Sequence, residues 1–166
     1  MKDYLINAMT QAMLDEDSTD YRNAKAMLRV LNENIDIYEQ VLNREEQFEI
    51  IKEIHAQCVL YGTHEEFEEF KPNELKNMRK YIAENIKGRK VTVYRGISDF
   101  NNNFEKGNCW TIDYEIARWF AHRGNNPKVL EMVVNRADIL FYTNQRNEQE
   151  VYLQDRFIKN YKVIEL

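Results

Sequence analysis

Three short segments in the second half of the chain carry side chains suited to chemistry. In VYRG (93–96), Arg95 ends a strand-like run and Gly96 lets the backbone turn. The guanidinium can therefore project into a cleft and bind a phosphate or a carboxylate. Further on, Cys109-Trp110-Thr111 precedes a helix-like stretch. In Glu148-Gln149-Glu150, strand alternation places both glutamates on one face, and paired carboxylates suit acid–base catalysis.

Each segment also has a purely structural interpretation. Arg95 can form a surface ion pair, and the two glutamates can be solvated at an exposed strand end. The 109–111 segment can be a buried strand, with Trp119 and Phe120 as core residues of the helix that follows.

The elements around these segments are predicted to be strands and one helix. Residues 113–122 predict a short helix with Asp113 as N-cap, after a loop at 99–108 rich in Gly and Asn. The predicted strands are VTVYRG (91–96), KVLEMVV (128–134), DILFY (138–142), EVYLQ (150–154) and YKVIEL (161–166).

The first half has helical periodicity throughout. The stripes are Leu5, Ala8, Met9, Ala12 and Met13; then Tyr21, Ala24, Leu28 and Leu31; then Ile37, Tyr38, Val41 and Leu42; then Phe48, Ile51, Ile54, Cys58 and Tyr61; and finally Leu75, Met78, Ile82 and Ile86. Expected boundary residues are Ser18, Thr19 or Asp20 as an N-cap, Gly62 as a C-cap and Pro72 in a first turn. The acidic stretch 65–69 predicts a solvated face or a linker.

Helices followed by strands predict an α+β fold, with a helical region at 1–88 packed on a β-rich core at 89–166. The chain has 166 residues, 12% aromatic, with only 5 Gly and 2 Pro, which excludes disordered and low-complexity classes. It has no apolar run long enough to span a membrane and no secretory signal pattern. We therefore expect a soluble cytoplasmic protein.

Charge and cysteine content narrow the possible partners. Residues 1–88 hold 11 basic and 18 acidic side chains, whereas residues 89–166 hold 12 and 10. An acidic first half argues against general nucleic-acid binding, while the second half can accept a small anionic ligand. Two cysteines and the scattered His55, His64 and His122 have no metal-ligand spacing, so no metal is expected.

Taken in order, the three segments resemble the arginine–serine–glutamate class of mono-ADP-ribosyltransferases, a family that includes bacterial toxins and phage-encoded enzymes. The resemblance covers the chain from about residue 89 onward, through VYRGI (93–97), CWTIDYEIARWFA (109–121) and DILFYTNQRNEQEVYL (138–153). It implies that the second half is the catalytic core and that NAD is the substrate.

The resemblance implies a role for each matching residue. Arg95 would hold NAD, Glu150 would be the catalytic glutamate, and Glu148 would select arginine as the acceptor. Cys109 stands where the family has the first serine of its S-T-S motif, and a thiol is a weaker hydrogen-bond donor, so Thr111 is expected to position Glu150. The expected NAD-binding residues are Arg95, Tyr94, Gly96, Cys109, Trp110, Thr111 and Tyr142; Phe141 is a further ring that can stack.

Three alternatives stay open at this point. An NAD glycohydrolase needs Arg95 and Glu150 but not Glu148, and a non-catalytic binding module would keep only the fold. A nucleic-acid-directed enzyme would need a basic groove, for which Arg118, Arg123 and Lys128 are available. For the transferase, the expected partner is a protein inside the cell that makes it, which is the host cell if the enzyme is phage-encoded. Export of the enzyme as an effector, by a signal that the sequence does not reveal, is equally open.

Overall fold

The chain folds as α-helices followed by an antiparallel sheet, which confirms the predicted α+β class. A computed structural model describes residues 7–8, 11, 20–60, 64–71, 75–99, 107–144 and 146–166. It divides into two compact units, Met1–Leu75 and Lys76–Leu166. We call them the helical unit and the sheet unit and describe each by itself.

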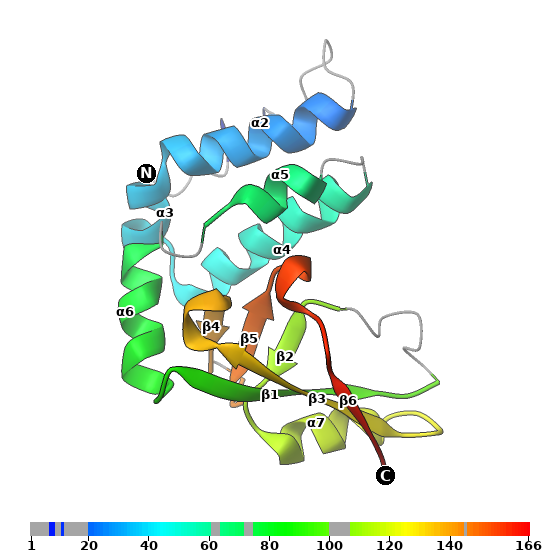
Figure 1. The fold of residues 1–166 in the computed structure, drawn as a ribbon. Coiled ribbons are helices and arrows are strands. Elements are labelled where there is room, and N and C mark those ends of the chain that lie inside the picture. Colours follow the sequence, from blue (N-terminus) through cyan, green and yellow to red (C-terminus); the bar gives the residue numbers. More distant parts are fainter. Residues whose placement is uncertain are drawn as a thin grey trace. The chain divides into compact units, whose positions relative to one another are not determined.

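Four described helices make up most of the helical unit: α2 (Asp20–Glu33), α3 (Ile35–Val41), α4 (Arg44–Leu60) and α5 (His64–Glu69). Ala8 of the first predicted stripe is half-buried. The other stripe residues of this unit whose side chains are described are buried: Leu28, Leu31, Tyr38, Leu42, Phe48, Ile51, Ile54 and Cys58. Helix α4 contacts both α2 and α5 and runs beside α5 (Figure 1).

Local hydrogen bonds fix the junction between α3 and α4. The backbone N–H of Asn43 donates to the Glu46 carboxylate, and the Glu46 N–H donates to the Asn43 side chain, both at 3.0 Å. This reciprocal pair is a capping box, which satisfies N–H groups at the start of α4. The buried Tyr38 hydroxyl donates to the Gln47 carbonyl at 2.7 Å and ties α3 to α4.

The acidic stretch 65–69 lies in helix α5 and not in a linker. Its single apolar residue, Phe67, is fully buried and stacks on the His55 ring of α4 at 4.5 Å between centroids. Glu65 and Glu69 are exposed, whereas Glu66 and Glu68 are half-buried. Phe70, which directly follows the helix, is also buried, so two aromatic rings dock this short segment.

The sheet unit contains six strands in the order β4-β5-β2-β1-β3-β6, and every pairing is antiparallel. The strands are β1 (Lys90–Ile97), β2 (Cys109–Thr111), β3 (Lys128–Asn135), β4 (Ile139–Thr143), β5 (Glu150–Leu153) and β6 (Lys162–Glu165). Helices α6 (Lys76–Asn85) and α7 (Tyr114–Ala121) and the 3₁₀ turns η3 (Arg136–Asp138) and η4 (Asp155–Phe157) connect or cover them.

The sheet falls into two groups of strands that meet at one point. Strands β1 and β3 pair at eight register positions, whereas β1 and β2 share a single position, Tyr94 opposite Thr111. Figure 1 shows β1, β3 and β6 running across the direction of β2, β4 and β5. Because one pair joins the groups, the strands diverge beside it and leave room for a cleft.

Helix α6 belongs with the sheet, so the observed units divide at Leu75, whereas the sequence analysis drew its boundary at residue 88. The Arg79 guanidinium donates to the carbonyls of Ile139 and Leu140 on β4. Tyr81 packs against Tyr142 at 5.6 Å between ring centroids. These contacts attach α6 to the strand at the end of the sheet.

Several expectations concern residues outside the described parts of the chain. They are the stripe residues Leu5, Met9, Ala12, Met13 and Tyr61, the caps Ser18 and Thr19, Gly62, Pro72, and positions 100–106 of the predicted loop. None of the described helices combines the length and apolar character that crossing a membrane requires.

Candidate active site

A cleft of about 220 Å³ opens in the sheet unit next to the single β1–β2 pair. Its lining residues are Tyr94, Arg95, Gly96, Cys109, Trp110, Thr111, Ala117, Phe120, Glu148 and Glu150. The cleft therefore brings together all three segments that the sequence analysis selected. Among the residues predicted to be catalytic or to bind NAD, Tyr142 alone does not line this cleft.

Arg95 lies inside β1 and does not end it, because the strand continues through Gly96 to Ile97. Its Nη1 donates to the Cys109 carbonyl at 2.5 Å and so bridges β1 and β2. Burial lowers the pKa of Arg95, while the nearby Cys109 and Glu150 raise it in part. A guanidinium keeps its charge despite such a shift, so the cleft contains a fixed, partly desolvated cation.

Gly96 has a different role from the predicted turn. A Cβ built on it would lie 2.0 Å from the Ala117 carbonyl oxygen and 2.6 Å from the Ala121 backbone nitrogen. The absence of a side chain therefore allows α7 to pack directly on β1. A glycine within a strand is a recognised sign of such a close backbone approach.

Strand β2 supplies backbone groups and a hydroxyl to the cleft. The Thr111 Oγ1 donates to the Glu148 carbonyl at 2.7 Å and accepts from the Asp113 N–H at 3.1 Å. We expected this hydroxyl to position Glu150; the bond seen here holds the backbone of Glu148. Cys109 contributes its carbonyl to Arg95, so this contact does not depend on the thiol.

Both glutamates line the cleft, but strand alternation does not place them there. Strand β5 begins at Glu150, which pairs with Thr111, so Glu148 precedes the strand. Gln149 between them has a φ of 46°, which lies in the left-handed region that residues other than glycine seldom adopt. The alternation argument is therefore wrong, although both glutamates do line the cleft.

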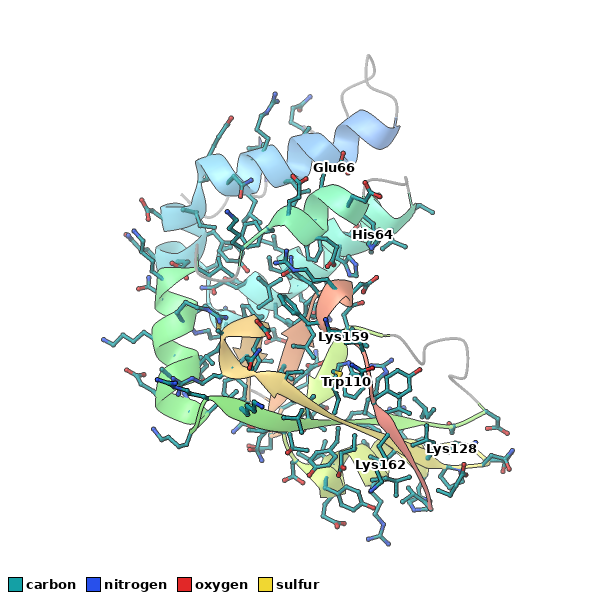
Figure 2. All side chains as sticks on the ribbon, in the orientation of Figure 1. His64, Glu66, Trp110, Lys128, Lys159 and Lys162 are labelled. Atoms are coloured by element: carbon teal, nitrogen blue, oxygen red, sulfur yellow. The ribbon has the colours of Figure 1, made fainter. Side chains whose placement is uncertain are left out.

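The aromatic residues separate into cleft and core. Tyr94 lines the cleft, packs edge-to-face on Tyr114, and has its pKa raised by burial and by Glu131. Trp110 (labelled in Figure 2) also contributes to the wall, but its side chain is buried and its Nε1 donates to the Gly107 carbonyl at 2.9 Å. Phe141 and Tyr142 are buried in β4.

Tyr142 therefore differs from its predicted role. It is buried and packs on Tyr81 of α6, and burial raises its pKa. The register places it opposite Val151, one position further along β5 than Glu150. Because neighbouring positions of a strand face opposite sides of the sheet, this ring points away from the glutamate.

Helix α7 contributes residues that sequence reasoning missed. Ala117 and Phe120, three positions apart and hence on one helix face, line the cleft. Trp119 is 62% exposed, so its assignment to the core is wrong. Asp113 caps this helix as predicted, accepting from the N–H groups of Glu115 and Ile116.

The cations proposed for a nucleic-acid groove have local contacts. Arg118 pairs with Glu115 at 3.2 Å, and Lys128 (Figure 2) pairs with Glu165 at 3.1 Å. Arg123 lies over the rings of Trp119 and Phe120 at 5.6 and 5.7 Å. These contacts reduce the positive charge that a groove of these three residues would offer to phosphates.

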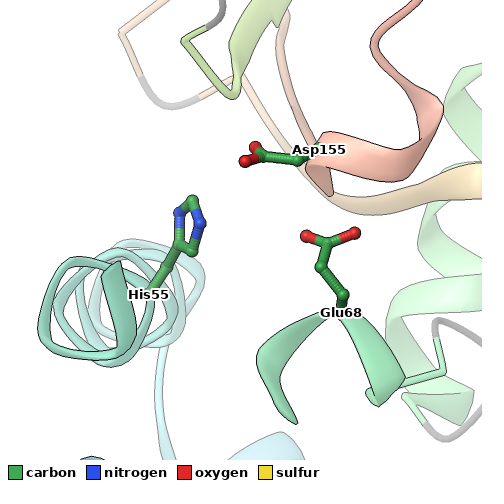
Figure 3. A group of neighbouring side chains, drawn as sticks. All are labelled: His55, Glu68 and Asp155. Carbon is green, nitrogen blue, oxygen red and sulfur yellow. The ribbon is translucent and has the colours of Figure 1, made fainter. Parts of the chain in front are cut away.

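Figure 3 shows potential metal-ligating side chains outside the cleft. In the helical unit, a His55 ring nitrogen and a Glu68 carboxylate oxygen lie within 4.8 Å of each other. Asp155 belongs to the sheet unit, where its carboxylate accepts from the Asn108 side-chain amide at 2.6 Å. Within the helical unit the two side chains supply half of the four ligands typical of a structural zinc site.

No protein-family model, curated protein or solved structure matches this chain. Function is therefore inferred from the cleft, where a partly buried guanidinium, two glutamates and the ring of Phe120 line one space. A volume of about 220 Å³ is below the 300–1,000 Å³ of pockets that enclose a whole drug-sized ligand.

Proposed function

We propose that this protein is an NAD-dependent mono-ADP-ribosyltransferase that modifies arginine side chains of a protein. The observation that carries the proposal is the presence of Arg95, Glu148 and Glu150 in one cleft. An anion-binding guanidinium beside two carboxylates matches a substrate that is itself anionic and reacts through a cation. NAD has this combination in its diphosphate and its nicotinamide–ribose bond.

The first step would break the bond between C1′ of the ribose and the nicotinamide nitrogen. The electron pair of this bond goes to the nicotinamide ring, which leaves as a neutral molecule, and the ribose becomes oxocarbenium-like. The Glu150 carboxylate would stabilise the developing positive charge more strongly than the ground state, which lowers the barrier. Arg95 would hold the diphosphate so that the ribose faces Glu150.

The second step would form the bond to the acceptor. A guanidinium nitrogen of the target arginine attacks C1′ and must lose a proton as it does so. Glu148, on the loop that leads into β5, would accept this proton as a general base. Water needs no such help to attack an oxocarbenium ion, so NAD cleavage without transfer would depend on Glu150 but not on Glu148.

The decisive experiment compares wild type, E148Q and E150Q for transfer of label from adenine-labelled NAD to proteins of a bacterial lysate. Released nicotinamide is measured in the same samples. We expect wild type to label discrete proteins, E150Q to lose both reactions, and E148Q to lose labelling while still releasing nicotinamide. Agmatine, a small guanidine, serves as a defined acceptor in a parallel assay.

Glu131 offers a matched control. It is a half-buried glutamate of the same sheet, on β3, and E131Q should leave both reactions within about twofold of wild type because it does not line the cleft. Nicotinamide release by wild type without any labelling would replace the proposal with an NAD glycohydrolase. Absence of both reactions in a folded protein would favour a non-catalytic binding module.

The proposal places the enzyme in the cytoplasm of the cell that makes it, because NAD and protein acceptors are both present there. A target in a phage-infected host is one such setting. The acidic helical unit would be available for contact with a basic target, as the 17 acidic and 7 basic side chains of residues 1–75 suggest.

A further inference from the structure

Gln149, the residue between the two glutamates, is held by hydrogen bonds of its backbone N–H, its backbone carbonyl and its side-chain NH₂ group. Its N–H donates to the Asn144 side chain at 3.1 Å, and its carbonyl accepts from the Ile112 N–H at 3.2 Å. Its side-chain amide donates to Asp113 Oδ2 at 3.3 Å. Contacts from three separate positions therefore hold one residue of the loop.

This fixation coincides with an unfavourable backbone conformation. Gln149 has a φ of 46°, and Asn147, two residues earlier, has a φ of 56°. Residues other than glycine persist in this region of φ where surrounding contacts compensate for the conformational strain energy. Such positions often occur at functional sites. At Gln149 the compensating contacts are the three hydrogen bonds above.

Asp113 connects this loop to helix α7. One carboxylate oxygen, Oδ1, caps the helix through the N–H groups of Glu115 and Ile116, and the other, Oδ2, accepts from Gln149. Thr111 makes a second connection, since its hydroxyl links the Glu148 carbonyl to the Asp113 N–H. The Glu148 carbonyl, through Thr111, and the side chain of the next residue, Gln149, are therefore both attached to the start of the helix whose residues line the cleft.

We infer that Gln149 is a positioning residue, which holds Glu148 in the cleft by binding Asp113. The inference rests on the proposed function and names a further residue that determines how the ADP-ribose is partitioned. The Gln149–Asp113 bond sets how much of the cleaved ADP-ribose goes to an arginine acceptor and how much to water. Glu150 lies in the β5 ladder opposite Thr111 and has its own support. Loss of the bond should therefore affect transfer more than NAD cleavage.

The test reverses the donor and the acceptor of this bond. Q149E places a carboxylate against Asp113 and removes the donor. D113N keeps Oδ1 as the helix cap and turns the other atom into a donor, and asparagine is as good a cap as aspartate. The double variant D113N/Q149E restores one donor and one acceptor in the opposite order.

We expect Q149E to lower the ratio of transfer to NAD cleavage by about ten- to a hundredfold, because small displacements of a catalytic group have effects of this size. The KM for NAD should stay within about twofold, and the double variant should recover most of the ratio. An unchanged ratio in Q149E, or a double variant as defective as Q149E, would overturn the inference.

Amide hydrogen exchange tests the bond without any enzymatic activity. In Q149E the backbone amides of Ile112 and of residue 149 should exchange faster, because the first donates to the carbonyl of residue 149 and the second donates to Asn144. The double variant should restore their protection. Unchanged exchange in Q149E would contradict the positioning role. A wild-type protein without NAD cleavage or transfer, yet with this exchange pattern, would instead contradict the proposed function.

Discussion

The guanidinium of Arg95 lies against the backbone of Gly107. A Cβ built on Gly107 would be 2.2 Å from Arg95 Nη2 and 2.5 Å from its Cζ. The φ of this glycine is outside the left-handed region, so the backbone itself accepts a side chain. The absence of a side chain at Gly107 therefore leaves space for the guanidinium of Arg95, which lines the cleft.

Replacement of Gly107 by alanine should displace Arg95 without unfolding the protein. The flexible guanidinium can move, but it would lose its place beside the Cys109 carbonyl. We expect the KM for NAD to rise by about tenfold or more, as for loss of a hydrogen bond to a charged group, with a smaller change in kcat. Steady-state kinetics of nicotinamide release measure both.

Thermal unfolding is the control for that variant. A G107A protein with a Tm near that of wild type and an unchanged KM would show that Arg95 does not need this position. R95K provides the comparison, since it retains the charge but loses the planar fork that binds phosphate oxygens in pairs. Its KM should rise at least as much as that of G107A.

Replacement of Gly96 by alanine should instead destabilise the sheet unit. The new Cβ would meet backbone atoms of Ala117 and Ala121, which cannot move without shifting α7. Overpacking of this kind costs about 1–3 kcal/mol and occasionally more. For a chain of 166 residues this corresponds to a fall in Tm of roughly 2–12 °C, which calorimetry can measure.

V133A is the matched control for G96A. Val133 lies on the neighbouring strand β3 and is 60% exposed, so its truncation should cost less than about 1 kcal/mol. If G96A and V133A have the same Tm, the close approach of α7 to β1 is not important for stability.

The buried hydroxyl of Tyr38 should make the helical unit sensitive to alkaline pH. Burial raises the pKa of Tyr38 above its ordinary value of 10.0. Above pH 10 the unfolded chain therefore releases this proton while the folded chain retains it, so stability falls as pH rises. Below pH 10 the full contribution of the protonated hydroxyl is present.

Y38F lacks this titration. At pH 8 it should be about 1 kcal/mol less stable than wild type, because the hydrogen bond to the Gln47 carbonyl is lost. The difference should shrink at pH 10.5 and above. Urea unfolding followed by circular dichroism at 222 nm provides both values, and a difference that stays constant with pH would contradict the assignment.

Periodicity was a reliable guide to the elements. The spacing of Leu28, Leu31, Ile51 and Ile54 predicted helices, and these residues are buried as expected. The helix that contains residues 65–69 is harder to predict from the sequence, because its single apolar residue, Phe67, forms no apolar stripe. Trp119 is the opposite case, since a large aromatic side chain on a short helix is normally a core residue.

Most of the residues that line the candidate site could be selected from the sequence, but the geometry of the cleft could not. Short segments around Arg95, Thr111 and Glu150 indicated a shared cleft. The left-handed backbone of Gln149 could not be foreseen, because glutamine has no preference for that region and the contacts that compensate come from residues 112, 113 and 144. Gly96 did carry a usable signal, since glycine inside a strand indicates close backbone contact.

The single pair that joins β1 and β2 has a consequence for when the proposed activity first arises during folding. The hydrogen bonds around the cleft connect residues 14 positions apart, for Arg95 and Cys109, up to 37 apart, for Thr111 and Glu148. Such non-local contacts form late because the chain must first close the loops between them. Under the proposed function, a nascent chain would therefore not consume NAD until β5 has been inserted between β4 and β2.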